Sequence, residues 1–131
     1  MSYDFLIVDD SPIIRSVVRK AIHLSGIDLG TLHEAENGRQ ALATLEQQHV
    51  DVVVADLNMP EMDGVELVRR IHEDLSLTVP VIIVSSDRSA DRIEELRARG
   101  IHDFLKKPFR PEELMAMVRQ ALPQQGGSRV G

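Results

Sequence analysis

Apolar runs of strand length alternate with segments of helical periodicity along the whole chain. Five short runs, rich in β-branched residues or bounded by turn residues, predict strands at 5–8, 31–36, 51–55, 81–84 and 101–106. Apolar residues spaced three or four positions apart predict helices at about 12–25, around 41–45, from 64 to about 71, around 93–98 and at 111–122. Ser11 and Pro12 are typical of the start of the first helix. The pattern therefore predicts five strand–helix units.

The first, third and fourth runs are apolar at nearly every position, which is typical of parallel strands buried on both faces. The units are too short and too few for a β/α barrel, which needs about 200 residues. The predicted fold class is α/β, a doubly wound five-stranded parallel sheet with helices on both faces. We expect one domain over 1–122 and a flexible tail or linker stub over 123–131.

Composition excludes several classes of function. A formal charge of −6 and only 3% aromatic residues argue against direct nucleic-acid binding. The sequence has no cysteine, which excludes disulfides and thiolate metal sites and favours a cytoplasmic location. The sequence contains no apolar segment of about 18 residues, so we expect no membrane association.

Polar residues follow the predicted strands at their carboxyl ends. They are Asp9 and Asp10 after the first strand, Asp56 after the third, Ser85 and Ser86 after the fourth, and Lys106 and Lys107 in or after the fifth. Taken singly, each is typical of a cap, a turn or a solvated surface position. Because the carboxyl ends of parallel strands meet at one edge of a sheet, together they predict a site there.

Carboxylates gathered at one edge repel one another, and a hard divalent cation removes that repulsion. An all-oxygen donor set favours Mg²⁺ over Zn²⁺, and the five histidines are scattered without ligand spacing. A carboxylate beside such a cation can act as a nucleophile toward a phosphoryl group. Asp56, with the Lys107 ammonium and the Ser85 hydroxyl, has the chemistry for that reaction.

Four motifs together resemble the receiver domain of two-component response regulators, in its stand-alone, chemotaxis-regulator-like (CheY-like) form. They are Ile7-Val8-Asp9-Asp10-Ser11, Ala55-Asp56-Leu57-Asn58-Met59-Pro60 with Met62-Asp63-Gly64, Val84-Ser85-Ser86, and Phe104-Leu105-Lys106-Lys107-Pro108-Phe109. The resemblance covers about residues 4–122 and implies a flavodoxin-like sheet with strand order 2-1-3-4-5.

The resemblance implies that Asp56 is the phospho-acceptor. Mg²⁺ would be held by Asp9, Asp10, Asp56 and the backbone carbonyl of Asn58. Lys107 would contact the phosphoryl group and precede a cis peptide bond to proline.

The resemblance also implies a switch made of Ser85 and Phe104. Serine stands where threonine is commoner, and phenylalanine where tyrosine is common, so the second departure leaves the output mode open. Asn58 and Asp87 lie two residues beyond Asp56 and Ser85, and we interpret them as setting the lifetime of the phosphorylated state.

The predicted function is a signalling protein, not a turnover enzyme, which catalyses its own phosphorylation and dephosphorylation. Its partners would be a sensor histidine kinase or phosphotransfer protein and a downstream protein target, with phosphorylation-dependent dimerisation as a further option. The interaction face would lie on the last two helices and the strand between them. Four basic residues there predict a strip that is either a docking surface or merely solvated: Arg92, Arg99, Lys106 and Arg110.

Two other functions share parts of this pattern. A pseudo-receiver that only binds partners is disfavoured by the complete set of site residues. A phosphatase of the haloacid-dehalogenase type needs an acidic residue two positions after its nucleophile, where this sequence has Asn58. The sequence leaves open whether the chain is full-length or excised from a multidomain regulator.

Overall fold

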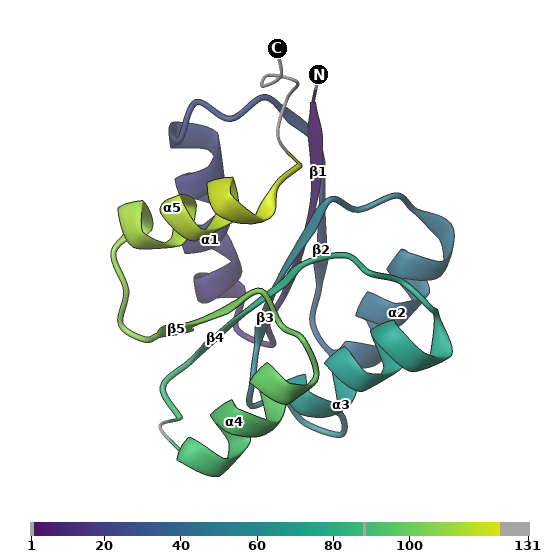
Figure 1. The fold of residues 1–131 in the computed structure, drawn as a ribbon. Helices are drawn as coiled ribbons and strands as arrows, with labels where there is room; N and C mark the ends of the chain where they lie inside the picture. The colour runs from purple at the N-terminus through teal and green to yellow at the C-terminus, as the bar shows by residue number, and fades with distance from the viewer. Residues whose placement is uncertain (1, 88, 124–131) are drawn as a thin grey trace.

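Strands and helices alternate along the chain (Figure 1), as the apolar pattern predicts. The structure is a computed structural model that describes residues 2–87 and 89–123. The elements are β1 (Tyr3–Val8), α1 (Pro12–Leu24), β2 (Leu29–Ala35), α2 (Gly38–Gln47), β3 (Val52–Asp56), α3 (Gly64–Arg69), the π-helix η1 (Arg70–Asp74), β4 (Val81–Ser85), α4 (Ala90–Ala98), β5 (Asp103–Lys106) and α5 (Pro111–Ala121). Residues 124–131 of the expected tail lie outside the described residues.

The five strands form one parallel sheet in the order β2-β1-β3-β4-β5, so the predicted fold class and strand order are confirmed. β3 and β4 lie between other strands, and every residue of both is buried. Their continuous apolar sequences reflect this position, because each face of a central parallel strand packs against helices.

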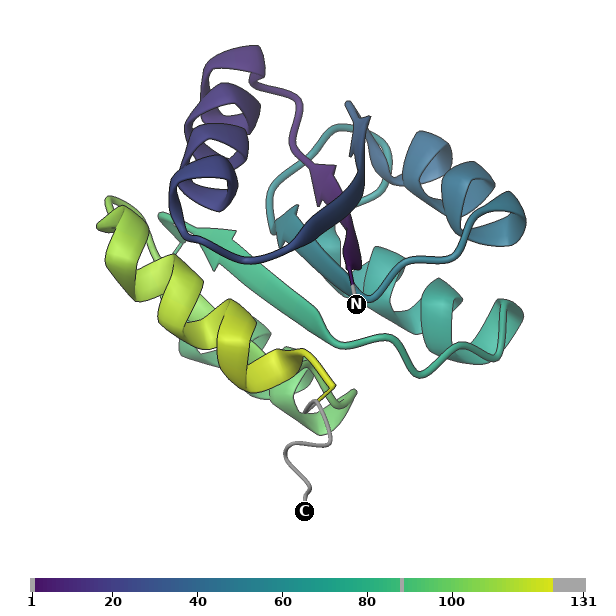
Figure 2. The ribbon, with the colours of Figure 1, turned by 90° about the horizontal axis from the view of Figure 1, so that it is seen from above.

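Successive residues of a strand point to opposite faces, which divides the core into two layers. Phe5, Val54 and Ile82 pack on the face covered by α1 and α5. Leu6 and Val53 pack on the opposite face, which is covered by α2, α3 and α4. Figure 2 shows the sheet with α1 and α5 on one side and α2 and α3 on the other. The sheet therefore has helices on both faces and leaves its carboxyl edge to the loops.

Local capping fixes where the helices begin. The Ser11 hydroxyl accepts a hydrogen bond from the backbone N–H of Ile14, with Pro12 opening α1 as the sequence predicts. Asp63 caps α3 through the N–H of Glu66. No helix in the described part of the chain is both long enough and apolar enough to cross a membrane.

The bounds of several elements differ from the predictions: β1 begins at Tyr3 rather than at residue 5, and β5 at Asp103 rather than at residue 101. The second strand begins at Leu29, two residues before its predicted start, because pairing with β1 adds residues that lack a strong apolar pattern. The third helix widens into a π-turn, in which Leu75 donates its N–H to the carbonyl of Arg70, five residues back. Helical periodicity alone does not predict such a local change of register.

Candidate functional site

The predicted site residues meet at the carboxyl edge of the sheet. Asp9 follows β1, Asp56 is the last residue of β3, Ser85 is the last residue of β4, and Lys107 follows β5. These strands are consecutive neighbours in the sheet, with Val8 beside Ala55 and Ser85 beside Lys106. The parallel topology thus brings together residues that are up to 98 positions apart in sequence.

Three carboxylates form the acidic part of the site. Asp9 and Asp56 are buried, with 2% and 7% of their surfaces exposed, whereas Asp10 is exposed. One oxygen from each lies within 4.8 Å of the others. The Asp9 carboxylate also accepts a hydrogen bond from the backbone N–H of Ser11, which orients it at the start of α1. The predicted cluster of three aspartates is therefore present.

Lys107 faces this cluster from β5. Its Nζ lies 3.3 Å from Asp9 Oδ2 and 3.4 Å from Asp56 Oδ1. Its backbone N–H donates to the carbonyl of Ser85 at 2.9 Å, and the peptide bond to Pro108 is cis, as the resemblance implies. The neighbouring Lys106 is exposed, whereas Lys107 contacts the cluster, and the role of Lys107 toward a phosphoryl group stays a prediction.

Burial raises the pKa of Asp56 above its usual value, and the nearby Asp9 carboxylate raises it further. The Lys107 ammonium lowers the same pKa by attraction and hydrogen bonding, but burial is the largest influence. One ammonium beside three carboxylates leaves excess negative charge at a partly dehydrated site. A divalent cation would relieve that excess, and three carboxylate oxygens are a donor set that suits Mg²⁺.

Ser85 is fully buried at the end of β4, the strand that neighbours β3 and its terminal Asp56. The Ser85 hydroxyl oxygen accepts hydrogen bonds from the backbone N–H of Asp87 at 3.0 Å and from Asn58 Nδ2 at 3.4 Å. Both bonds use lone pairs of Oγ, so the hydroxyl hydrogen can still be donated to an anion. Phe104, the other predicted switch residue, is half-buried against the core on the face of α2, α3 and α4 and lies beside Ile83 in the sheet.

Arg92, which the sequence interpretation assigns to the basic strip, is bonded to residues around the candidate site. Its guanidinium donates to Asn58 Oδ1 at 2.9 Å, to Asp63 Oδ2 at 2.8 Å and to Asp87 Oδ2 at 3.1 Å. These partners come from the loops after β3 and β4. They are up to 34 residues away from Arg92 in sequence, and no local spacing signal connects them.

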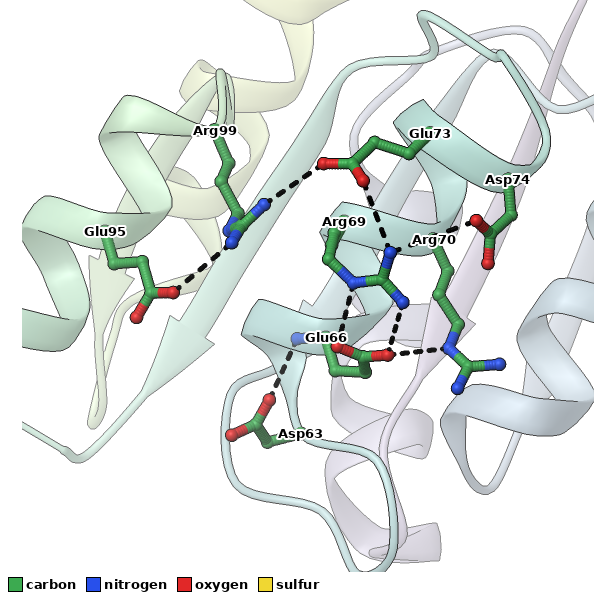
Figure 3. Close-up of polar contacts among 8 residues, drawn as sticks. All are labelled: Asp63, Glu66, Arg69, Arg70, Glu73, Asp74, Glu95 and Arg99. Atoms are coloured by element: carbon green, nitrogen blue, oxygen red, sulfur yellow. Dashed lines mark hydrogen bonds and ion pairs between the residues drawn. The ribbon is translucent and has the colours of Figure 1, made fainter.

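Two of the four residues of the predicted basic strip form ion pairs within the protein, and the role of the strip stays a prediction. Arg92 is paired at the site, and Arg99 lies 3.4 Å from Glu73 and 3.5 Å from Glu95 (Figure 3). Lys106 and Arg110 are exposed.

A second polar cluster, also drawn in Figure 3, joins α3 to η1. Glu66 accepts hydrogen bonds from Arg69 at 2.7 and 3.0 Å and from Arg70 at 2.8 Å. These bonds lower the pKa of Glu66 from 4.5 to about 2. This cluster lies along the helices and includes none of the predicted site residues, so we interpret it as structural.

The fold and the site define a class of protein: a doubly wound α/β domain with buried carboxylates and a facing lysine at the carboxyl edge of its sheet. The model of the response regulator receiver domain matches residues 5–119, and the chain belongs to this family. The predicted family is thus confirmed.

Both relatives and solved structures support this assignment. The chain is 35% identical to the transcriptional regulatory protein TrcR of Mycobacterium tuberculosis over 89% of its own length and 44% of TrcR. It is 33% identical to the two-component response regulator ORR3 of Oryza sativa subsp. indica, covering 89% of this chain and 88% of ORR3. The chemotaxis protein CheY4 of Vibrio cholerae has a similar fold, with a TM-score of 0.83 and 31% identity over 93% of this chain and all of CheY4. The chain spans less than half of the first two curated relatives it matches, at 44% and 24% of their lengths.

Proposed function

We propose that this receiver domain accepts a phosphoryl group on Asp56 from the phosphohistidine of a sensor histidine kinase or phosphotransfer protein. The observation that carries this proposal is the position of Asp56: its buried carboxylate lies 3.4 Å from Lys107 Nζ and within one acidic cluster with Asp9 and Asp10. A nucleophile in this arrangement has an ammonium group beside it and two further carboxylates with which it could share a metal ion.

The transfer follows from the chemistry of these groups. A carboxylate oxygen of Asp56 forms a bond to phosphorus while the bond to the donor breaks and its electron pair leaves with the donor. The product is an aspartyl-phosphate. The Lys107 ammonium, 3.4 Å from Asp56, and the buried Ser85 hydroxyl would donate to oxygens of the incoming group and neutralise charge as it develops.

Asp9, Asp10, Asp56 and the backbone carbonyl of Asn58 would hold Mg²⁺. When bound, the metal supplies charge neutralisation at the phosphoryl oxygens. The acidic cluster supports the three carboxylates as ligands, and the carbonyl comes from the family resemblance.

The switch would begin at Ser85. A phosphoryl group on Asp56 adds strong acceptor oxygens next to the Ser85 hydroxyl, whose oxygen otherwise accepts from Asp87 and Asn58. Reorientation of Ser85 would change the loop after β4 and allow Phe104 to move inward. The face of α4, β5 and α5 would pass this change to a protein target or to a second copy of the domain.

The protein would act in the cytoplasm, through contacts with other proteins. It would catalyse its own phosphorylation and its own dephosphorylation by water.

The test is to incubate the protein with Mg²⁺ and acetyl phosphate and to follow its intact mass. We expect the mass to increase by one phosphoryl group, and Asp56→Asn to abolish the increase. Asp74→Asn is the matched control, because Asp74 lies on η1 and contacts Arg69 rather than the site. No added mass in the wild type, or an undiminished increase in Asp56→Asn, would overturn the proposal. Many turnovers without accumulation would instead indicate a phosphatase.

A further inference from the structure

Arg92 joins three segments that surround the phospho-acceptor. Its side chain, from the first turn of α4, contacts Asn58 in the loop after β3, Asp63 at the start of α3, and Asp87 in the loop after β4. Asn58 also donates to Ser85 Oγ, and Asp63 also caps α3. A single guanidinium is therefore connected both to the predicted switch hydroxyl and to the N-terminus of a neighbouring helix.

The contact with Asp87 has a direct consequence for the site. One Asp87 oxygen accepts from the backbone N–H of Ser89 at 2.8 Å, and the other accepts from Arg92 at 3.1 Å. Both carboxylate oxygens are thus held in fixed directions. The backbone N–H of Asp87 is bonded to Ser85 Oγ, so this carboxylate is attached to the rim of the phosphorylation site.

Charge supports the same interpretation. Asp63 and Asp87 are both partly exposed, with 40% and 22% of their side chains accessible, and Arg92 lies between them at 30%. An isolated surface ion pair adds little to stability. A planar guanidinium that binds three acceptors from three segments instead fixes their relative positions.

We propose that Arg92 is a positioning residue that lengthens the life of the aspartyl-phosphate by holding the Asp87 carboxylate away from the attacking water. The inference rests on the proposed function. In the loss of the phosphoryl group, a water oxygen bonds to phosphorus and the bond from phosphorus to the Asp56 oxygen breaks with its electron pair. The products are the Asp56 carboxylate and dihydrogen phosphate, which carries both hydrogens of the water. A carboxylate released from Arg92 can accept a hydrogen bond from that water and so orient it.

The experiment compares the rate of single-exponential decay of the phosphorylated state between the wild type and its variants. Each protein is phosphorylated with acetyl phosphate and Mg²⁺, separated from the donor, and followed by intact mass. We expect Arg92→Gln to decay about fivefold faster, which corresponds to one lost hydrogen bond of about 1 kcal/mol. Arg92→Lys should be intermediate, because an ammonium cannot span the three acceptors.

Arg99→Gln is the matched control. Arg99 is the C-cap of the same helix and is also paired with acidic residues, but its partners Glu73 and Glu95 are outside the site. We expect its decay rate to equal that of the wild type. Asp87→Asn should suppress the acceleration when combined with Arg92→Gln, because the double variant lacks the carboxylate that Arg92 restrains.

The possible outcomes separate this inference from the proposed function. If the wild type acquires no phosphoryl group, the proposed function itself fails. If the wild type is phosphorylated but Arg92→Gln decays at the same rate or more slowly, the positioning role of Arg92 is wrong. The role is equally wrong if Arg99→Gln accelerates decay as much, or if Asp87→Asn leaves the acceleration of Arg92→Gln intact. Thermal unfolding of each variant shows whether the fold is retained.

Discussion

Gly64 lies where α3 begins, against the end of the strand that carries Asp56. A Cβ added at this position would lie 2.9 Å from Leu57 Cα, 3.1 Å from the carbonyl oxygen of Asp56 and 3.2 Å from Leu57 Cδ1. Carbon atoms pack best at about 3.5–4.0 Å, so the backbone itself must shift. The Gly64 N–H also donates to the Leu57 carbonyl at 2.6 Å, which leaves little room for that shift.

The cost of Gly64→Ala can be estimated from these contacts. Overpacking of a rigid site costs about 1–3 kcal/mol in the free energy of unfolding. Alanine gains helix propensity of at most about 1 kcal/mol in a helix interior, and less at this first helical position. We therefore expect a net loss of about 1–2 kcal/mol, or about 4–8 °C in Tm. The accompanying displacement of Asp56 by a few tenths of an ångström should slow phosphorylation by acetyl phosphate about three- to tenfold.

The assay measures Tm by thermal unfolding and the phosphorylation rate by intact mass, with Gly26→Ala as control. Gly26 has a φ of 83° and no atom within 4 Å of an added Cβ, so alanine there costs about 1–2 kcal/mol of backbone strain. Gly26 lies between α1 and β2, in the loop at the opposite edge of the sheet from the site. We expect it to lower Tm but leave the rate unchanged. The reasoning is refuted if Gly64→Ala keeps the wild-type Tm and rate, or if Gly26→Ala slows phosphorylation equally.

Two further predictions concern charge. Because burial raises the pKa of Asp56, the ionised carboxylate destabilises the folded protein above that pKa, and the penalty disappears as the pH falls through it. Asp56→Asn should therefore raise Tm at neutral pH in the presence of a chelator, and the increase should become smaller as the pH is lowered. Adding Mg²⁺ should stabilise the wild type more than the variant. A lower Tm for the variant than for the wild type in chelator would contradict this prediction. Glu66 has a lowered pKa, so its contribution to stability is complete above pH 4.5 and is lost as the pH falls toward about 2. Glu66→Gln should lower Tm at neutral pH, and thermal scans at decreasing pH should show the Tm of the variant approach that of the wild type. A difference in Tm that persists at pH 2 would exclude the ion pairs of Glu66 with Arg69 and Arg70 as its cause.

Much of the site could be predicted because its residues are tied to strand ends. Asp56 and Ser85 each close a buried apolar run, and Lys107 follows a third strand-like run. Once the strands are parallel, these ends meet at one edge of the sheet, whatever the details of helix packing. The strand order itself came from the resemblance to receiver domains, because apolar periodicity carries no information on which strands are neighbours.

Arg92 shows where such reasoning stops. Its position in the sequence predicts that it lies on a helix near other basic residues, in an exposed basic strip. In the folded protein its long side chain reaches Asp63, 29 positions away, and Asn58, 34 positions away. That contact depends on how α4 packs beside α3 and on the path of the loop after β4, neither of which has a local sequence signal.

The apolar pattern along the chain was enough to predict the alternation of strands and helices, the burial of the central strands, and the set of polar groups at one edge of the sheet. These properties follow from side-chain hydrophobicity and from periods of two and 3.6 residues, which are local. The distance between Lys107 and Asp56, the direction of the pKa shift at Asp56, and the three bonds of Arg92 follow only from the folded arrangement. Those quantities depend on atoms that come together only when the helices dock on the sheet and exclude water from its carboxyl edge.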